Sequence, residues 1–237
     1  MSMWNWRASF DAVPDGARVS LGEGHTPLIP SRRIGPRAGM RRLLFKLESS
    51  NPSGSYKDRF ASAAVSHMVA SGQRNCLATS SGNTGAALAA YCAAAGIRCE
   101  IAIVETAPLA KLQQMMAYGA EIYRVRGFGL DDRVTEQVFQ ALLRRSQQAD
   151  SALQISAFKY SPKGMGGVRT LGHELVHQVE SSPQHLGGGR IDHVFCPAGG
   201  GGLALAMAQA FAQIAGRRAD WLPPRVECVQ PAGNNTI

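Results

Sequence analysis

Short apolar runs alternate with alanine-rich stretches along most of this 237-residue chain, and no other feature limits its fold as strongly. We expect the apolar runs to form strands at residues 43–47, 75–79, 99–104, 121–125, 193–196 and 226–229. We expect helices at residues 58–71, 84–95, 110–118, 131–148, 171–180 and 203–215. Strands that alternate with helices in this way form parallel sheets that are covered by helices on both faces. The sequence therefore predicts an α/β fold built on parallel sheets.

The composition is that of a globular protein, with 45% apolar residues. The longest apolar stretch, residues 203–216, is shorter than the roughly 20 residues of a membrane helix and carries two glutamines. The net charge of +8 comes mostly from dispersed arginines. No aromatic side chains alternate with the densest arginines to stack on bases. We therefore expect neither a membrane nor a nucleic acid as a partner.

The cysteines are odd in number and form no Cys-x-x-Cys pair. They are Cys76, Cys92, Cys99, Cys196 and Cys228. Such spacing is typical of reduced thiols in a cytoplasmic protein rather than of disulfides or a zinc site. We therefore predict a cytoplasmic location and no metal site.

Lys57 stands in the segment Ser-Tyr-Lys-Asp-Arg, after a turn at residues 51–54 and directly before a predicted helix. A lysine that is partly buried at the positive end of a helix has its charged form disfavoured. A neutral amine is what Schiff-base chemistry with an aldehyde requires. The alternative is a solvated lysine that pairs with Asp58. We predict that Lys57 is the catalytic residue.

Two turns, each between a predicted strand and a predicted helix, suit anions. The first, residues 80–85, reads Ser-Ser-Gly-Asn-Thr-Gly, and its hydroxyl and N–H groups suit a carboxylate. The alternative is an ordinary helix cap made by Ser81 or Asn83. The second turn is a glycine run that suits a phosphate. The alternative is a plain connection between a strand and a helix. The glycine run consists of Gly199, Gly200, Gly201 and Gly202.

A reactive lysine, a carboxylate turn and a phosphate loop together indicate pyridoxal 5′-phosphate acting on an amino acid. These segments, in this order, resemble the fold-type II pyridoxal-phosphate family, and threonine synthase within it. The similar segments are residues 3–6, 21–28, 46–48, 51–59, 111–114 and 118–120. The resemblance covers nearly the whole chain.

The resemblance implies two three-layer domains, each with a parallel sheet, and the cofactor between them. The small domain would comprise residues 57–149, and the large cofactor-binding domain residues 1–56 and 150–237. Chains of this family continue beyond the strand at 226–229, with further strands and a Ser or Thr that hydrogen-bonds the pyridine nitrogen. We therefore expect a truncated chain with an incomplete large domain, and a homodimer for the full-length protein.

The resemblance also implies roles for single residues. Lys57 would bind the cofactor aldehyde and then move the proton at the substrate Cα. Asn83 would hydrogen-bond the 3′-oxygen of the cofactor, and the glycine run would hold its phosphate. Three side chains would bind the substrate carboxylate, namely Ser80, Ser81 and Thr84. Lys111 and Arg169 would bind a second anion, such as a substrate phosphate, or are solvated surface charges.

The expected reaction is β- or γ-elimination or replacement on a small amino acid, which is phosphorylated in the threonine synthase case. That enzyme converts O-phosphohomoserine to threonine. Threonine synthases usually carry an Arg-Leu-Glu-Gly-Gln-Lys-Thr type segment, whose Arg and Glu positions here are Gly164 and Gly166. Chemistry like that of cysteate synthases or of serine/threonine dehydratases is therefore an alternative. An inactive remnant is another.

A rival motif, His173-Glu174-Leu175-Val176-His177, matches the HExxH pattern of zinc hydrolases. On a helix, its two histidines would share one face, with the glutamate as base. No third ligand follows in a familiar arrangement. The alternative is a helix that packs on the large domain.

Overall fold

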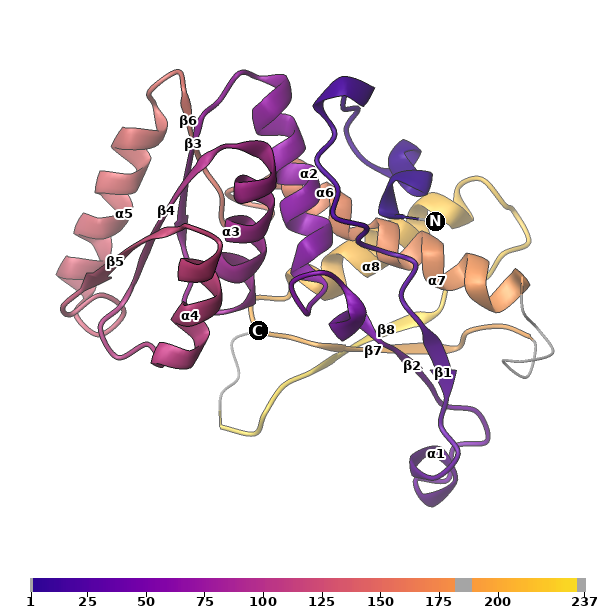
Figure 1. Cartoon of the computed structure of the whole chain (residues 1–237). Helices are drawn as coiled ribbons and strands as arrows, with labels where there is room; N and C mark the ends of the chain where they lie inside the picture. Colours follow the sequence, from indigo (N-terminus) through magenta and orange to yellow (C-terminus); the bar gives the residue numbers. More distant parts are fainter. Residues whose placement is uncertain (1, 182–188, 234–237) are drawn as a thin grey trace.

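The computed structural model describes residues 2–181 and 189–233 and has the predicted α/β fold (Figure 1). Its largest sheet has four parallel strands in the order β5-β4-β3-β6. They are β3 (Asn75–Thr79), β4 (Arg98–Val104), β5 (Glu121–Val125) and β6 (Ser151–Leu153). The first three confirm predicted strands. The fourth, β6, extends the sheet past the boundary that the sequence placed after residue 149.

Helices cover both faces of this sheet, because successive strand side chains point to opposite faces. Cys76 and Ala78 contribute to the core that α2 and α3 cover, whereas Leu77 packs with Leu142 of α5 on the other face. Figure 1 shows α5 on one side of the sheet and α3 with α4 on the other. The helices are α2 (Lys57–Ala70), α3 (Asn83–Ala95), α4 (Leu109–Ala117) and α5 (Asp132–Ser146). This unit therefore has three layers.

A second unit is built on β7 (His193–Pro197) and β8 (Arg225–Val229), which pair in parallel. Two helices, α7 (Thr170–Ser181) and α8 (Gly202–Ala215), share a core with these strands. Cys196 and Val226 supply the strand side of that core. The predicted strands and helices of this part of the chain are thus confirmed.

A glycine-rich segment for which we predicted no helix forms α6 (Pro162–Val168). Its backbone lies very close to α2. A Cβ atom at Gly167 would stand 2.4 Å from the carbonyl oxygen of Arg59, and one at Gly164 would stand 2.7 Å from the ring of Phe60. Only glycine permits this approach, so helix packing explains these two positions.

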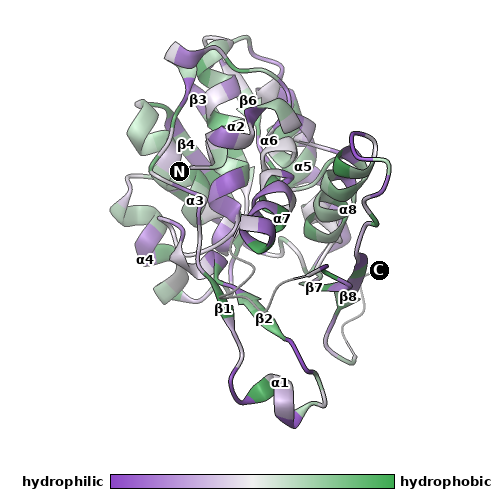
Figure 2. Cartoon of the chain, turned by 90° about the vertical axis from the view of Figure 1, so that its right-hand side faces the viewer, coloured by the Kyte–Doolittle hydropathy of each residue, from purple (hydrophilic) through white to green (hydrophobic). Residues whose placement is uncertain are grey.

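The N-terminal part of the chain forms an arm and an anchor. The arm is the antiparallel pair of β1 (Leu28–Pro30) and β2 (Leu44–Lys46), with α1 (Ile34–Arg37) at its tip. Figure 2 shows it extending away from the helices. The anchor is Glu23, whose buried carboxylate accepts hydrogen bonds from Trp4, Ser62 and Tyr91. Three short 3-10 helices, η1 (Met3–Ser9), η2 (Asp15–Ala17) and η3 (Glu48–Ser50), complete this part.

Within residues 2–181 and 189–233, no helix is both long enough and apolar enough to span a bilayer.

Candidate active site

Lys57 is the first residue of α2, and its amine is mostly withdrawn from water. Nζ donates a hydrogen bond to Oγ of Ser156 at 2.8 Å and lies 4.5 Å from the ring centre of Tyr56. Burial lowers the pKa of Lys57 to about 8. The carboxylate of Asp58 does not pair with Lys57, because it accepts hydrogen bonds from the backbone and hydroxyl of Ser53. Burial therefore disfavours the charged form of Lys57, as the sequence predicted. The alternative, in which Lys57 pairs with Asp58, is absent.

Ser156 connects Lys57 to the substrate turn that we predicted. Its Oγ lies 2.8 Å from Oγ1 of Thr84, which is buried in the first turn of α3. A continuous line of polar atoms thus runs from the Lys57 amine through Ser156 to Thr84. Ser156 lies in the loop after β6, outside any recognisable motif, and sequence reasoning missed it. Only its meeting with residues 57 and 84 in space reveals it.

The turn before α3 is shaped to leave the N-terminus of that helix uncovered. Gly82 is the N-cap residue, and no side chain caps the helix there. The Ser80 hydroxyl instead accepts the N–H of Gly82 at 3.2 Å. A Cβ atom at Gly85 would stand 2.5 Å from the Ser80 carbonyl oxygen, so glycine is needed for the turn to close. The alternative of a helix cap made by Ser81 or Asn83 is therefore wrong, and the geometry suits an anion.

The glycine run connects β7 to α8 and also starts a helix without a side-chain cap. Gly201 has φ +72°, a left-handed conformation that favours glycine. A Cβ atom at Gly199 or Gly200 would meet nothing within 4 Å, so the space in front of this loop is open. A Cβ atom at Gly202 would stand 3.6 Å from the carbonyl oxygen of Ser156. The loop therefore lies beside the polar line that includes Lys57, and the space in front of it and the uncapped start of α8 suit a phosphate group.

A side chain from the end of β8 supports the glycine run. Nε2 of Gln230 donates to the carbonyl oxygens of Ala198 and Gly199 at 3.1 and 3.3 Å. These bonds connect the loop to the neighbouring strand. Nothing in the spacing of Gln230 along the chain could have predicted this contact.

The other predicted site residues lie apart from this line of contacts. Asn83 is exposed in the first turn of α3, and Ser81 is partly exposed before it. Lys111 lies in α4, and its side chain is outside the described part of the structure. Arg169 donates to the carbonyl oxygen of Ser9 at 3.1 Å, so its guanidinium faces the N-terminal segment. A role for Lys111 or Arg169 in binding a second anion stays a prediction.

A pocket among the described residues lies elsewhere. It has a volume of about 300 Å³ and is lined by residues of α2 and α6, including His67 and Lys163. His67 is near the end of α2, far along the helix from Lys57. This pocket contributes nothing to the arrangement described above.

The HExxH motif lies on α7, as expected, but its glutamate is part of a buried ion network. The Glu174 carboxylate pairs with Arg59 at 3.0 Å and with Lys46, and it accepts the N–H groups of His25 and Thr26. Burial alone would raise the pKa of Glu174, but the charges of Arg59 and Lys46 lower it to about 2. Such a carboxylate is a poor base at neutral pH.

The two histidines of the motif have other partners. His173 shares a hydrogen bond of 2.9 Å with Gln213, and the Trp6 ring packs against both His173 and His177. These contacts give the motif a structural role and disfavour the zinc-hydrolase alternative. The motif stabilises the contact between α7, the arm and the N-terminal segment.

Comparisons with known proteins show the family of this chain. The family model for pyridoxal-phosphate dependent enzymes matches residues 19–237. Threonine synthase of Bacillus sp. (strain ULM1) is 32% identical over 228 residues, which cover 96% of this chain and 58% of that protein. Threonine synthase of Halalkalibacterium halodurans is 38% identical over 133 residues, or 54% of this chain and 37% of that protein. This chain thus spans only part of the length of these relatives.

Solved structures share the fold. O-ureido-L-serine synthase superposes with a TM-score of 0.67 at 23% identity, over 88% of this chain and 61% of that one. Cysteine synthase from Entamoeba histolytica superposes with a TM-score of 0.67 at 24% identity, over 81% of this chain and 55% of that one. At such identities the likeness concerns the fold alone. The match of the family model over most of the chain is decisive, and this chain belongs to the family of pyridoxal-phosphate dependent enzymes.

Proposed function

We propose that this chain binds pyridoxal 5′-phosphate through Lys57 and acts as a lyase or synthase on a small amino acid, as threonine synthase does. The observation that carries the proposal is the desolvated amine of Lys57, which is joined through Ser156 to the turn before α3. The relatives named threonine synthase support this class of reaction. We also propose a cytoplasmic location and a homodimer.

The residues present fit the cofactor. Its phosphate would bind at the glycine run, where there is space in front of the loop and α8 contributes the positive end of its dipole. Its aldehyde would be within reach of Lys57, and Asn83 would hydrogen-bond the 3′-oxygen. When bound, the cofactor supplies an electron sink for the substrate Cα carbanion.

The chain's own residues would bind the substrate and move its proton. Ser80, Ser81 and Thr84 would bind the substrate carboxylate with the N–H groups at the start of α3. This orients the Cα–H bond toward Lys57, whose neutral amine would take the proton as a general base. Ser156 would hold the amine in place by its hydrogen bond.

The proposed substrate is O-phosphohomoserine, with phosphoserine, serine and threonine as the alternatives. Gly164 and Gly166 are buried in α6, against Phe60 and Phe10, and carry no side chain for a substrate phosphate. This observation favours the dehydratase-like alternative, because its substrates serine and threonine carry no phosphate. Lys111 and Arg169 are the remaining candidates for a second anion.

The first test is covalent capture of the cofactor. The purified chain is mixed with one equivalent of pyridoxal phosphate, reduced with borohydride and digested for peptide mass analysis. We expect one pyridoxyl group per chain, on Lys57. An adduct that is spread over surface lysines such as Lys163, or the absence of any adduct on folded protein, would contradict the proposal.

The second test distinguishes the reactions. The chain with bound cofactor is incubated with each of the four substrates, and phosphate, threonine and keto acids are measured. Threonine formed from O-phosphohomoserine supports the threonine synthase proposal. Keto acids formed from serine or threonine support the dehydratase alternative. Release of phosphate from phosphoserine, with no product from O-phosphohomoserine, supports the cysteate synthase-like alternative. If the cofactor is attached to Lys57 but none of the four substrates reacts, the chain is an inactive remnant.

A further inference from the structure

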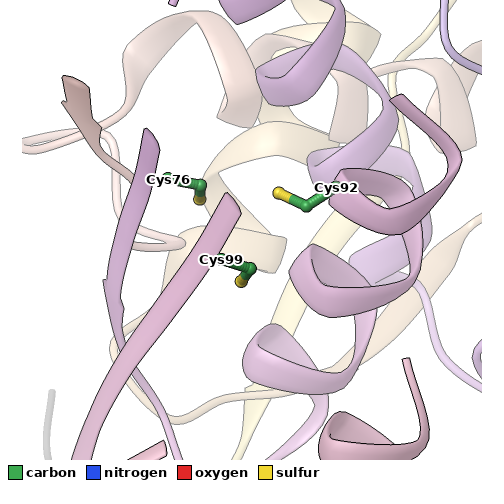
Figure 3. Close-up of side chains that lie close together, drawn as sticks. All are labelled: Cys76, Cys92 and Cys99. Atoms are coloured by element: carbon green, nitrogen blue, oxygen red, sulfur yellow. The ribbon is translucent and has the colours of Figure 1, made fainter. Parts of the chain in front are cut away.

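Three cysteine side chains converge in the core of the small domain. Cys76 of β3, Cys92 of α3 and Cys99 of β4 have their sulfur atoms within 4.8 Å of one another. Figure 3 shows Cys92 reaching from its helix toward the two strands that carry the other thiols. All three are free thiols, and their exposed fractions are 0%, 0% and 4%. The sequence predicted no metal site because the cysteines are scattered, odd in number and form no Cys-x-x-Cys pair.

This cluster is distinct from the site at Lys57. Cys76 and Cys99 are register partners, and each is the second residue of its strand. They therefore lie at the amino end of the parallel sheet, whereas the turn of residues 80–85 follows the carboxyl end of β3. Cys92 lies in the last turn of α3, which leads back to β4. No residue of the cluster takes part in the contacts around Lys57.

The spacing of the three sulfur atoms suits a shared metal ion. A metal–sulfur bond of about 2.3 Å in a trigonal plane places the sulfur atoms about 4.0 Å apart. Because the separations here do not exceed 4.8 Å, side-chain adjustments of a few tenths of an ångström would complete the plane. A single buried cysteine is simply a small apolar residue, but three that converge form a donor set.

The donor set also limits which ion fits. No fourth His, Cys, Asp or Glu ligand joins the three thiols in the part of the chain that the structure describes. Structural zinc sites need four protein ligands. Soft thiolate sulfur favours Cu(I) over hard cations. Each metal–sulfur bond that forms replaces an S–H bond, and the proton passes to the solvent.

We propose that Cys76, Cys92 and Cys99 form a trigonal thiolate site for a soft monovalent metal ion, Cu(I). The ion would connect β3, α3 and β4 at the amino end of the sheet. The site is independent of the proposed enzymatic function.

The test measures Cu(I) binding by the whole chain without oxygen, with the ion supplied as its acetonitrile complex against a chromogenic Cu(I) chelator. We expect one tightly bound ion per chain. Removing even an outer partner of a metal ligand costs about 10–100-fold in affinity, so each single Cys→Ala change in the cluster should cost at least about tenfold. The three variants are Cys76→Ala, Cys92→Ala and Cys99→Ala.

The chain offers a matched control. Cys196 and Cys228 are also register partners on adjacent parallel strands, but no third thiol joins them among the described residues. Cys196→Ala and Cys228→Ala should leave the affinity unchanged. If these two variants lose the ion and the cluster variants keep it, or if the native chain retains no Cu(I), the proposal is wrong and the cluster only fills the core.

A second measurement does not depend on the variants folding. X-ray absorption at the copper edge of the loaded native chain should show three sulfur neighbours at about 2.3 Å. A shell with two sulfur atoms, or with nitrogen or oxygen neighbours, would overturn the trigonal site.

Discussion

Lys57 and Arg59 lie two residues apart at the start of α2, and both are largely withdrawn from water, yet their environments differ. Lys57 contacts a hydroxyl group, and burial lowers its pKa to about 8. Burial would also lower the pKa of Arg59, but hydrogen bonds and charges from Glu48 and Glu174 raise it above its ordinary value. Arg59 is completely buried, at 0% exposure. The counter-charge, and not burial alone, therefore decides whether the pKa of a buried basic group is lowered or raised.

The largest expected effect is on the Lys57 side of this comparison. Lys57→Ala should abolish covalent attachment of pyridoxal phosphate, because the Lys57 amine joins the candidate site through Ser156, whereas the other desolvated amine, that of Lys46, is paired with Glu174. Mass spectrometry of the intact protein after borohydride reduction measures the covalent attachment. Lys163→Ala, which changes an exposed lysine, is the matched control and should keep one cofactor per chain. Covalent cofactor retained by Lys57→Ala would contradict the assignment.

The corresponding change on the Arg59 side is Glu174→Ala. It leaves Arg59 and Lys46 without their shared carboxylate, and breaking a buried ion pair costs about 3–5 kcal/mol. Urea unfolding measures the free energy of unfolding. Glu180→Ala removes an exposed carboxylate from the same helix and should cost less than about 1 kcal/mol. If the two variants lose equal free energy of unfolding, burial of the ion network does not contribute to stability.

The pH dependence of cofactor attachment sharpens the comparison. A lowered pKa means that Lys57 loses its proton at lower pH than an ordinary lysine. With a pKa of about 8, the neutral fraction rises about fiftyfold between pH 6 and pH 8. The initial rate of attachment, followed by stopped-flow absorbance, should rise accordingly and level off at higher pH. A rate that still rises tenfold per pH unit above pH 9 would indicate an ordinary lysine.

A smaller effect is expected at Ser156, which positions the Lys57 amine. Ser156→Ala removes the hydrogen bonds to Lys57 and to Thr84. The bond to the Lys57 amine is worth about 1–1.5 kcal/mol, so attachment should slow by about tenfold without being lost. Stopped-flow rates at fixed pH measure it. Ser146→Ala, which changes a serine on α5 with only a local contact, should have no effect. Complete loss of attachment in Ser156→Ala would make this residue more than a positioning group.

The smallest effect is expected from His173→Ala. It removes a hydrogen bond to Gln213 and a ring contact with Trp6, which together contribute about 1 kcal/mol to stability. Thermal unfolding and metal analysis measure the two possible consequences. We expect a small decrease in Tm and no zinc in either protein. Stoichiometric zinc that is lost in the variant would restore the hydrolase interpretation.

Local patterns explain what could be predicted. The ranges of β3, β5 and α3 follow from apolar runs, helix propensity and a glycine stop, which act over a few neighbouring residues. The same local chemistry marked Lys57 and the two anion-suited turns. The helix α6 was missed because three of its seven residues are glycines, which disfavour helices unless a close neighbour requires them.

By itself, the sequence determined most of the strands and helices, the family, and the short segments that we propose carry the chemistry. Only the tertiary structure decided which of these segments meet. Ser156 reaches Lys57 across 99 residues, and Glu174 reaches Arg59 across 115. The three converging thiols depend on the pairing of β3 with β4 and on α3 packing against them. Strand order, register and helix packing set such contacts, and a local pattern contains no information about them.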